Sequence, residues 1–506
     1  MVTNASISTP SSLPDGSPPD PRRWLAFGVV LSAGFMDLVD TTIVNVAAPS
    51  IQRDLHAEFA QVEWIVSAYA LAFAALLIVS GRLGDIYGRK RVFLTGLAGF
   101  TLASLMCGLA VNPAMLIASR FAQGAMSGLM VAQILAILRV SFAPHERAKA
   151  VAAFGGVTGS SVVFGFVLGG VLVQWNLFGL QWRPMFLVNI PVGVATFAAA
   201  WFVVRESRSP AKPKIDPIGI ALAVAAVTLL VYPFTEGRQL GWPAWTFAMM
   251  ACGAAALAAF VAFERHRSAT TGSPLVEFAV FASKPFSVGA GMWFLFWVAL
   301  PGFFLVWTLY MQSGLGWTPL RAGLTAAPYA IGVGIGAANA PTKLVPRFGR
   351  NVLVAGALIN ALGFAAFAWL AWHDSAGVSS WQIIPIHLVS GIGMGMVVAP
   401  TLDMLLGHVP SHDAGAASGL LNTLQQVGFA FGVALAGVVF FTRLEHPQTT
   451  IQANTEIYSH AFSYTLRYVV GLLIVVALGF LALPKEPRTT TPDLEPEASS
   501  TIERKA

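Results

Sequence analysis

Two carboxylates lie three residues apart in an apolar stretch near the start of the chain. Asp37 and Asp40 occur in GFMDLVDTTIVNVAAPS, residues 34–50. An ionisable side chain near the centre of a bilayer is energetically costly, so it usually marks the path of an ion or a substrate. At this spacing on a helix the two side chains lie on nearly the same face, and each raises the proton affinity of the other. The pair therefore predicts a site that binds and releases a proton.

One arginine is a candidate counter-charge for these carboxylates. Arg120 is the basic residue that we place in the interior of a predicted membrane span. A guanidinium stays charged, so it favours the ionised form of a nearby carboxylate and can drive proton release. A purely structural buried pair between Arg120 and Asp40 is the alternative interpretation.

Other polar residues in the apolar segments are candidates for lining a cavity. Asn45, Gln123 and Gln426 are neutral groups that either contact a substrate or bridge helices. Asp403 lies near the cytoplasmic end of a predicted span, where a side chain reaches water easily. His387 lies near the start of the same span, a position typical of the membrane interface.

The composition is that of a protein that crosses a membrane many times. Of the 506 residues, 56% are hydrophobic and 11% are charged, and the mean hydropathy is +0.69. Apolar runs of roughly 20 residues, the length that spans a hydrocarbon core, recur almost to the end of the chain. We predict fourteen spans, near residues 24–46, 61–80, 92–111, 114–136, 150–173, 185–203, 215–234, 245–263, 286–309, 322–341, 351–371, 382–404, 415–440 and 465–483.

The distribution of basic residues predicts the orientation of these spans. Of the 30 lysines and arginines, 23 lie in segments that are cytoplasmic if both termini are cytoplasmic, six lie in external segments, and one lies inside a span. Lysine and arginine accumulate on the cytoplasmic side of membrane proteins. The net charge of +6 follows from this bias and gives no indication of a nucleic-acid partner.

Short internal similarities predict the domain organisation. GRLGDIYGRKR at 81–91 is similar to KLVPRFGRN at 343–351, and GAMSGLMVAQ at 124–133 is similar to GIGMGMVVAP at 391–400. Transporters are often built from such repeats. We therefore expect a disordered cytoplasmic tail (1–20), a six-helix bundle (21–204), two inserted spans (205–270), a second six-helix bundle (271–484) and a cytoplasmic tail (485–506).

The loop GRLGDIYGRKR predicts a conformational latch. Gly81, Gly84 and Gly88 allow a tight turn and close approach of two helices. Asp85 can accept hydrogen bonds at a neighbouring helix N-terminus, and Arg89 offers a planar donor fork to a carboxylate. Such a charged latch could stabilise one of the two conformations between which a transporter alternates.

This loop resembles motif A of the major facilitator superfamily, and other stretches match that superfamily in order. LVDTTIVNVAAPSI resembles the first-span signature of the fourteen-span drug:proton antiporter family, and RFAQGAMSG, residues 120–128, resembles its motif B. QWRPMFLVNIPVG at 181–193 and GLLNTLQQVGFAFGVAL at 419–435 are similar to its spans 6 and 13. The resemblance implies an all-α membrane protein of two six-helix bundles plus two extra central spans. It also implies that Asp40 is the proton-carrying carboxylate and that Arg120 lines the central cavity.

One stretch departs from this pattern. In GSSVVFGFVLGG, residues 159–170, Phe166 occupies the position where exporters of this family usually have a proline. Gly165, Gly169 and Gly170 remain and can still permit bending. The departure favours the alternative function, proton-coupled uptake of a small organic solute on the same fold.

The function predicted is proton-coupled export of organic compounds across the plasma (inner) membrane by alternating access. A phosphate-binding loop of the type GxxxxGK[ST] does not occur in any loop, so the expected energy source is the proton gradient. We expect a monomeric transporter rather than an enzyme, with a small organic substrate, protons and the lipid bilayer as partners. Cys107 and Cys252 both fall within spans, and neither a metal site nor a cofactor site is predicted.

Overall fold

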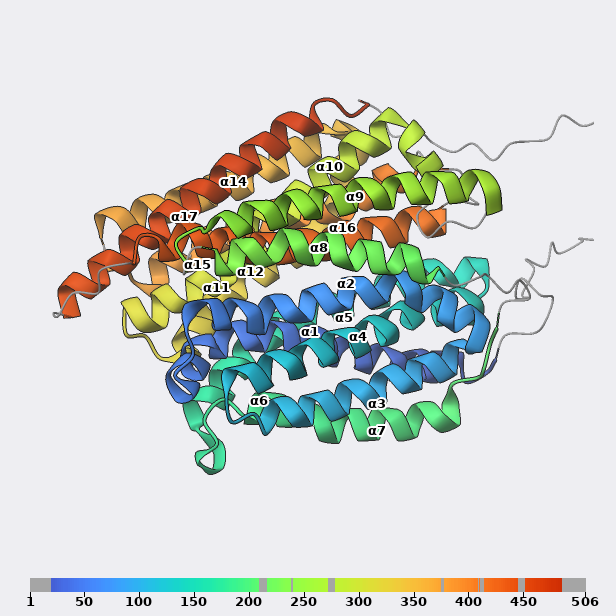
Figure 1. The fold of residues 1–506 in the computed structure, drawn as a ribbon, viewed down its shortest axis with the longest axis horizontal. Coiled ribbons are helices and arrows are strands. Elements are labelled where there is room, and N and C mark those ends of the chain that lie inside the picture. Colours follow the sequence, from blue (N-terminus) through green and yellow to red (C-terminus); the bar gives the residue numbers. More distant parts are fainter. Residues whose placement is uncertain are drawn as a thin grey trace, which may run out of the picture.

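The structure is a computed structural model, and its described part is helical throughout. It describes residues 20–208, 216–237, 240–271, 278–374, 377–407, 409, 414–444 and 451–484. Long helices run side by side along one axis (Figure 1). A helix satisfies its backbone hydrogen bonds internally, which a chain in hydrocarbon requires.

In the described residues, the N-terminal half contains seven α-helices, of which the last two together form one apolar segment, Pro184–Val203. Its fourth helix begins with Asn112 as N-cap, whose side chain accepts a hydrogen bond from the Met115 amide, and with Pro113 in the first helical turn. The helices are α1 (Arg23–Leu55), α2 (Phe59–Tyr87), α3 (Arg89–Gly108), α4 (Pro113–Ser141), α5 (Pro144–Trp175), α6 (Pro184–Leu187) and α7 (Asn189–Val203).

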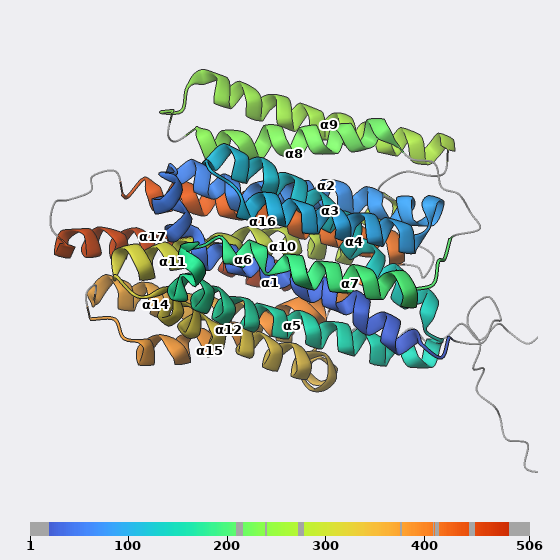
Figure 2. The same cartoon turned by 90° about the horizontal axis from the view of Figure 1, so that it is seen from below.

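Two further helices, the inserted pair, lie on one side of the molecule (Figure 2). They are α8 (Pro217–Glu236) and α9 (Ala244–Thr271). The inserted helix α8 contacts both α2 and α16, so it covers the seam between the two halves. Trp64 Nε1 on α2 donates a hydrogen bond to Glu236 Oε1 at 2.8 Å, whereas the ring of Phe234 meets that of Phe431 on α16 at 6.1 Å.

The C-terminal half contains the remaining helices. The predicted ninth span is two helices in the structure, joined at Leu300 and Pro301, because a proline cannot donate the next helical hydrogen bond. The helices are α10 (Lys284–Ala299), α11 (Pro301–Leu309), α12 (Pro319–Asn339), α13 (Val345–Phe348), α14 (Asn351–His373), α15 (Ser380–Leu406), α16 (Ala414–Phe441) and α17 (Ile451–Phe480).

The number of apolar spans differs from the prediction of fourteen. In the described residues, 13 helical segments are long and apolar enough to cross a membrane. The remaining predicted span, 322–341, corresponds to α12, in which Gly332 and Gly336 lie against the backbone of α15 and Gly323 against that of α5. The small residues that permit this close contact also lower the hydropathy of the segment.

The sequence similarity between the two halves corresponds to a repeated helix contact. Gly124 on α4 lies against the backbone of Tyr69 on α2, and Gly391 on α15 lies against the backbone of Tyr329 on α12. A Cβ atom at either glycine would collide with the tyrosine backbone. Glycine at these positions therefore allows the same helix pair to form in both halves.

Segments predicted to be cytoplasmic lie at one end of the bundle, at the right in Figure 1. Arg23 at the start of α1 forms an ion pair of 2.8 Å with Glu146 at the start of α5. The Arg89 amide donates to the Ser207 carbonyl at 3.0 Å. At the opposite end, Arg183 pairs with Asp54 at 2.7 Å.

This arrangement leads to a topology prediction. Tags at both termini and in the loop 81–91 are expected to report a cytoplasmic location, and a tag near residue 450 is expected to report an external one. The measurement is labelling of tagged protein in intact cells by a membrane-impermeant reagent. Protection of the tag near 450, together with labelling at the termini, would contradict the prediction.

Candidate functional site

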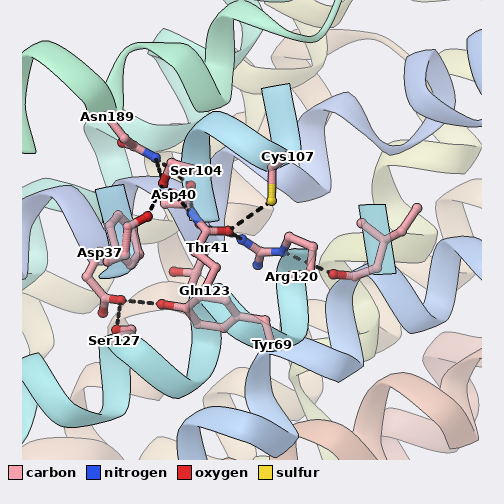
Figure 3. Close-up of polar contacts among 12 residues, drawn as sticks. Asp37, Asp40, Thr41, Tyr69, Ser104, Cys107, Arg120, Gln123, Ser127 and Asn189 are labelled. Atoms are coloured by element: carbon pink, nitrogen blue, oxygen red, sulfur yellow. Dashed lines mark hydrogen bonds and ion pairs between the residues drawn. The ribbon is translucent and has the colours of Figure 1, made fainter. Parts of the chain in front are cut away.

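Asp40 and Arg120 form a buried ion pair in the N-terminal half. Asp40 lies on α1 and Arg120 on α4, and Arg120 Nη1 is 2.6 Å from Asp40 Oδ2 (Figure 3). Each residue is only 1% exposed. A charged pair this deeply buried requires good geometry and further hydrogen bonds, because removing ions from water is costly.

Amide side chains from two helices supply those further hydrogen bonds. Asp40 Oδ1 accepts from Gln123 Nε2 on α4 at 2.9 Å and from Asn189 Nδ2 on α7 at 2.7 Å. Gln123 Nε2 also donates to Ser104 Oγ on α3 at 2.8 Å. The carboxylate therefore has three donors, all of which suit its ionised form.

Arg120 also makes contacts with α2. Its Nε donates to the Ile65 carbonyl at 3.1 Å, and its guanidinium lies 4.2 Å from the ring centroid of Tyr69. Arg120 Nη1 donates to Gln123 Oε1 as well, at 2.6 Å. The guanidinium thus joins α1, α2 and α4, so a change in the charge of Asp40 alters how these helices are held together.

Asp37 has a separate set of partners. Its Oδ1 accepts hydrogen bonds from the hydroxyls of Tyr69 and Ser127, and the side chain is buried. Within the described residues no hydrogen bond joins Asp37 to Asp40 (Figure 3). The two carboxylates therefore differ in kind, because Asp40 is paired with a cation and Asp37 with neutral hydroxyls.

Several residues of this site are not among the predicted site residues. They are neutral polar side chains within apolar helices, and no charge marks them. Asn189 stands in the stretch 181–193 and Ser127 in the stretch 120–128, both of which resemble family motifs, and this is the available signal. The residues are Tyr69, Ser104, Cys107, Ser127 and Asn189.

One of the four predicted cavity residues lies in this site. Gln123 is part of it, and Asn45 is buried on α1 with its Oδ1 unpaired in the described structure. Gln426 is half-buried on α16, and Asp403 is exposed near the end of α15. The structure therefore does not bring these four residues together.

The predicted interfacial position of His387 is wrong. The side chain is fully buried, 0% exposed, and its Nδ1 lies 2.7 Å from the Thr325 carbonyl. Aromatic rings surround it, including that of Trp307 at 4.6 Å. The helix α15 begins at Ser380, so His387 lies about two turns inside it.

The predicted latch residues surround the break between α2 and α3. Gly88 separates the two helices with a φ of +109°, a conformation that favours glycine. Arg89 Nη2 contacts Asp85 Oδ1 across this break at 2.8 Å. A Cβ at Gly84 would collide with the side chain of Gln133 on α4, whereas one at Gly81 would meet nothing within 4 Å. Gly81 therefore takes no part in the close approach that the sequence predicted.

Comparison with known proteins identifies the family. The sequence model of the Major Facilitator Superfamily matches residues 30–433. The chain is 41% identical over 432 residues to the "Probable actinorhodin transporter" of Streptomyces coelicolor, covering 85% of this chain and 75% of the relative. It is 32% identical over 471 residues to the "Puromycin resistance protein pur8" of Streptomyces alboniger, covering 91% of each chain.

A solved structure shares the fold. It is that of a bacterial homolog of the human lysosomal transporter Spinster, in an inward-facing and occupied conformation. The match has a TM-score of 0.66 and 14% sequence identity, and it covers 91% of this chain and 97% of the other. At this identity the match supports the fold alone.

Proposed function

The chain belongs to the Major Facilitator Superfamily, and on this premise we propose that it is a secondary transporter that exports organic compounds in exchange for protons. Relatives named for transport or resistance to antibiotics support efflux as the direction. The observation that most supports proton coupling is the buried ion pair of Asp40 with Arg120. The names of these relatives argue against uptake, the alternative favoured by Phe166, which is therefore not retained.

The proposed architecture retains fourteen spans. It counts α12 with the 13 apolar segments, since α12 lies along α5 and α15 as a full-length helix. We further propose two six-helix bundles, 21–204 and 271–484, separated by the inserted spans. The protein is then a monomer of the plasma membrane with both termini in the cytoplasm.

Contacts between the halves support a state that is closed on the external side. Gln312 Nε2 donates to the Val46 carbonyl at 2.8 Å, and the Leu320 amide donates to Gln174 Oε1 at 3.3 Å. Under the proposed topology these contacts lie toward the external ends of α1 and α5. An external proton reaches Asp40 only after the halves separate at this end.

The proposed cycle follows from the partners of Asp40. When the external end opens, a proton neutralises Asp40 and weakens its contact with Arg120, which remains charged. This loosens α1 from α4 and favours return to the inward-facing state. Binding of an organic substrate, which competes with the proton for the same cavity, then drives loss of the proton to the cytoplasm. This restores the pair and favours the outward change again.

The direct test of export is accumulation of candidate compounds in cells. A panel of chemically diverse compounds is applied to cells with and without the gene, and growth and intracellular concentration are measured. Expression is expected to lower the accumulation of some compounds and to raise resistance to them. Accumulation that rises on expression would indicate uptake instead.

The proposed latch makes a prediction about transport rate. Asp85→Asn or Arg89→Ala is expected to slow export without removing substrate binding, because the contact sets the populations of two states and lies outside the substrate cavity. The matched control is Arg91→Ala, whose side chain in the first turn of α3 is 69% exposed and 3.7 Å from Glu206. A tenfold loss of substrate affinity, about 1.4 kcal/mol, in a folded latch variant would count against the proposal.

A further inference from the structure

A groove on the outer surface of the C-terminal half ends in a cluster of basic and aromatic side chains. It lies between α14 and α17 and has a volume of about 250 Å³. Trp369, Trp372, His373 and Arg467 line one end of it. Under the proposed topology this end lies at the external surface of the membrane, where tryptophan is commonly found.

Arg467 has hydrogen-bond donors available in this groove. Its guanidinium carbon lies 4.6 Å from the ring centroid of Trp372 and 5.0 Å from that of Tyr464. Stacking uses the faces of the guanidinium and leaves its N–H groups free at the edge. Within the described residues Arg467 forms no ion pair. An edge of this kind binds a phosphate through paired hydrogen bonds.

A second arginine adds positive charge beside the groove. Arg443 is exposed and lies 4.3 Å from the ring centroid of Tyr464, and His460 stacks on Trp372 at 4.2 Å. Basic residues are uncommon in the predicted external segments, which hold six of the 30 lysines and arginines, and two of those six are Arg443 and Arg467. These arginines lie on the predicted external side, where the positive-inside rule expects few basic residues. A specific anionic ligand therefore explains their position better than membrane topology does.

The other end of the groove is apolar and lies deeper in the membrane. It is lined by Ala365 and Ala368 on α14 and by Val470 on α17. From Ala365 to His373 the helix rises about 12 Å. Charge at the surface and an apolar wall below it match a phospholipid, whereas a free phosphate would use the charged end alone.

We propose that this groove binds an anionic phospholipid of the external leaflet. Arg467 pairs with the lipid phosphate, and the first part of one acyl chain lies along Ala365 and Ala368. Arg443 disfavours a headgroup that carries its own cation, which selects anionic over zwitterionic lipid. The groove shares no residue with the cluster around Asp40 and Arg120.

The test measures lipid binding to the purified full-length protein in detergent by native mass spectrometry. The probes are phosphatidylglycerol, phosphatidylcholine and inorganic phosphate. Phosphatidylglycerol is expected to bind best, and Arg467→Gln is expected to weaken that binding about fivefold, since one basic residue near an anionic surface contributes about 1 kcal/mol. Arg467→Lys keeps the charge but loses the planar edge, so it is expected to give a smaller loss, roughly twofold.

The matched control is Arg321→Gln. Arg321 also stacks on a tryptophan, with its guanidinium carbon 3.7 Å from the ring centroid of Trp317, but its Nε is bound to Ser380 Oγ at 3.1 Å and it lies outside the groove. This variant is expected to bind phosphatidylglycerol like the parent protein.

Three results would overturn the proposal. The first is equal binding of phosphatidylglycerol by the parent and by both Arg467 variants. The second is an equal loss in Arg321→Gln, which would show a general charge effect. The third is displacement of the lipid by inorganic phosphate at similar concentration, which would indicate a free-anion site. If Arg467→Gln does not fold, Arg467→Lys decides the first comparison.

Discussion

Asp40→Asn is expected to abolish substrate-induced proton release and export against a gradient, while the protein still inserts and binds substrate. Asparagine keeps the size of aspartate but cannot ionise, so one step of the cycle is lost. Arg120 retains its contacts with the Ile65 carbonyl, Gln123 Oε1 and the Tyr69 ring, which offsets the loss of its carboxylate partner. The measurement is proton release from purified protein in detergent on addition of a transported substrate.

Asp37→Asn is the matched control for this experiment. Its donors are the hydroxyls of Tyr69 and Ser127, which can rotate to suit an amide, whereas the donors around Asp40 include a fixed guanidinium. We therefore expect Asp37→Asn to shift the pH dependence and to keep proton release. If Asp37→Asn stops proton release and Asp40→Asn does not, the roles of the two carboxylates are reversed. Normal release by both variants would exclude either as the coupling group.

Arg120→Lys is expected to lower export by more than tenfold although the charge is kept. An ammonium is a compact point charge and cannot contact Asp40, Gln123 and the Ile65 carbonyl with the geometry of the planar guanidinium. Hydrogen bonds of charged groups contribute about 1.5–3 kcal/mol each, so the loss of one exceeds a tenfold change. Initial rates of export from cells or vesicles, with the amount of inserted protein measured in parallel, test this expectation.

The control for this variant is Arg183→Lys. Arg183 also forms an arginine–aspartate pair in the N-terminal half, at 2.7 Å from Asp54, but the two side chains are 23% and 18% exposed and lie at the end of the bundle. Partly exposed pairs contribute little to stability. Near-parental export by Arg183→Lys, together with loss in Arg120→Lys, would locate the effect in the buried site. Equal rates for both variants would contradict a special role of Arg120.

Charged residues of the site could be found from the sequence, whereas most of their partners could not. Asp40 and Arg120 stand out because ionisable groups are rare within apolar spans. Asn189 is neutral and comes from another helix, so its contact with Asp40 depends on how the helices pack. Ser104 reaches the site only through Gln123 and Asn189. The position of His387 could not be inferred from hydropathy, because aromatic rings from three other helices, α11, α12 and α14, enclose it.

The count of 13 apolar segments, against the fourteen predicted spans, has a related cause. Hydropathy measures how well a segment suits lipid, but α12 is held by contacts with other helices through Gly323, Gly332 and Gly336. Its length and place are predicted from an apolar run at 322–341, while its weak hydropathy has its cause in tertiary packing. The similarity between residues 124–133 and 391–400 is visible in the sequence because Gly124 and Gly391 each allow a close helix contact.

The inserted pair makes two lipid-facing sides of the molecule different from each other. On one side α8 and α9 cover the seam of α2 with α16, and the seam of α5 with α12 lies on the opposite side (Figure 2). There Phe164 and Leu324 are exposed, with no further helix over them in the described structure. A compound dissolved in the bilayer therefore meets two unequal sides of the molecule, because an inserted helix covers the seam between the halves on one side only.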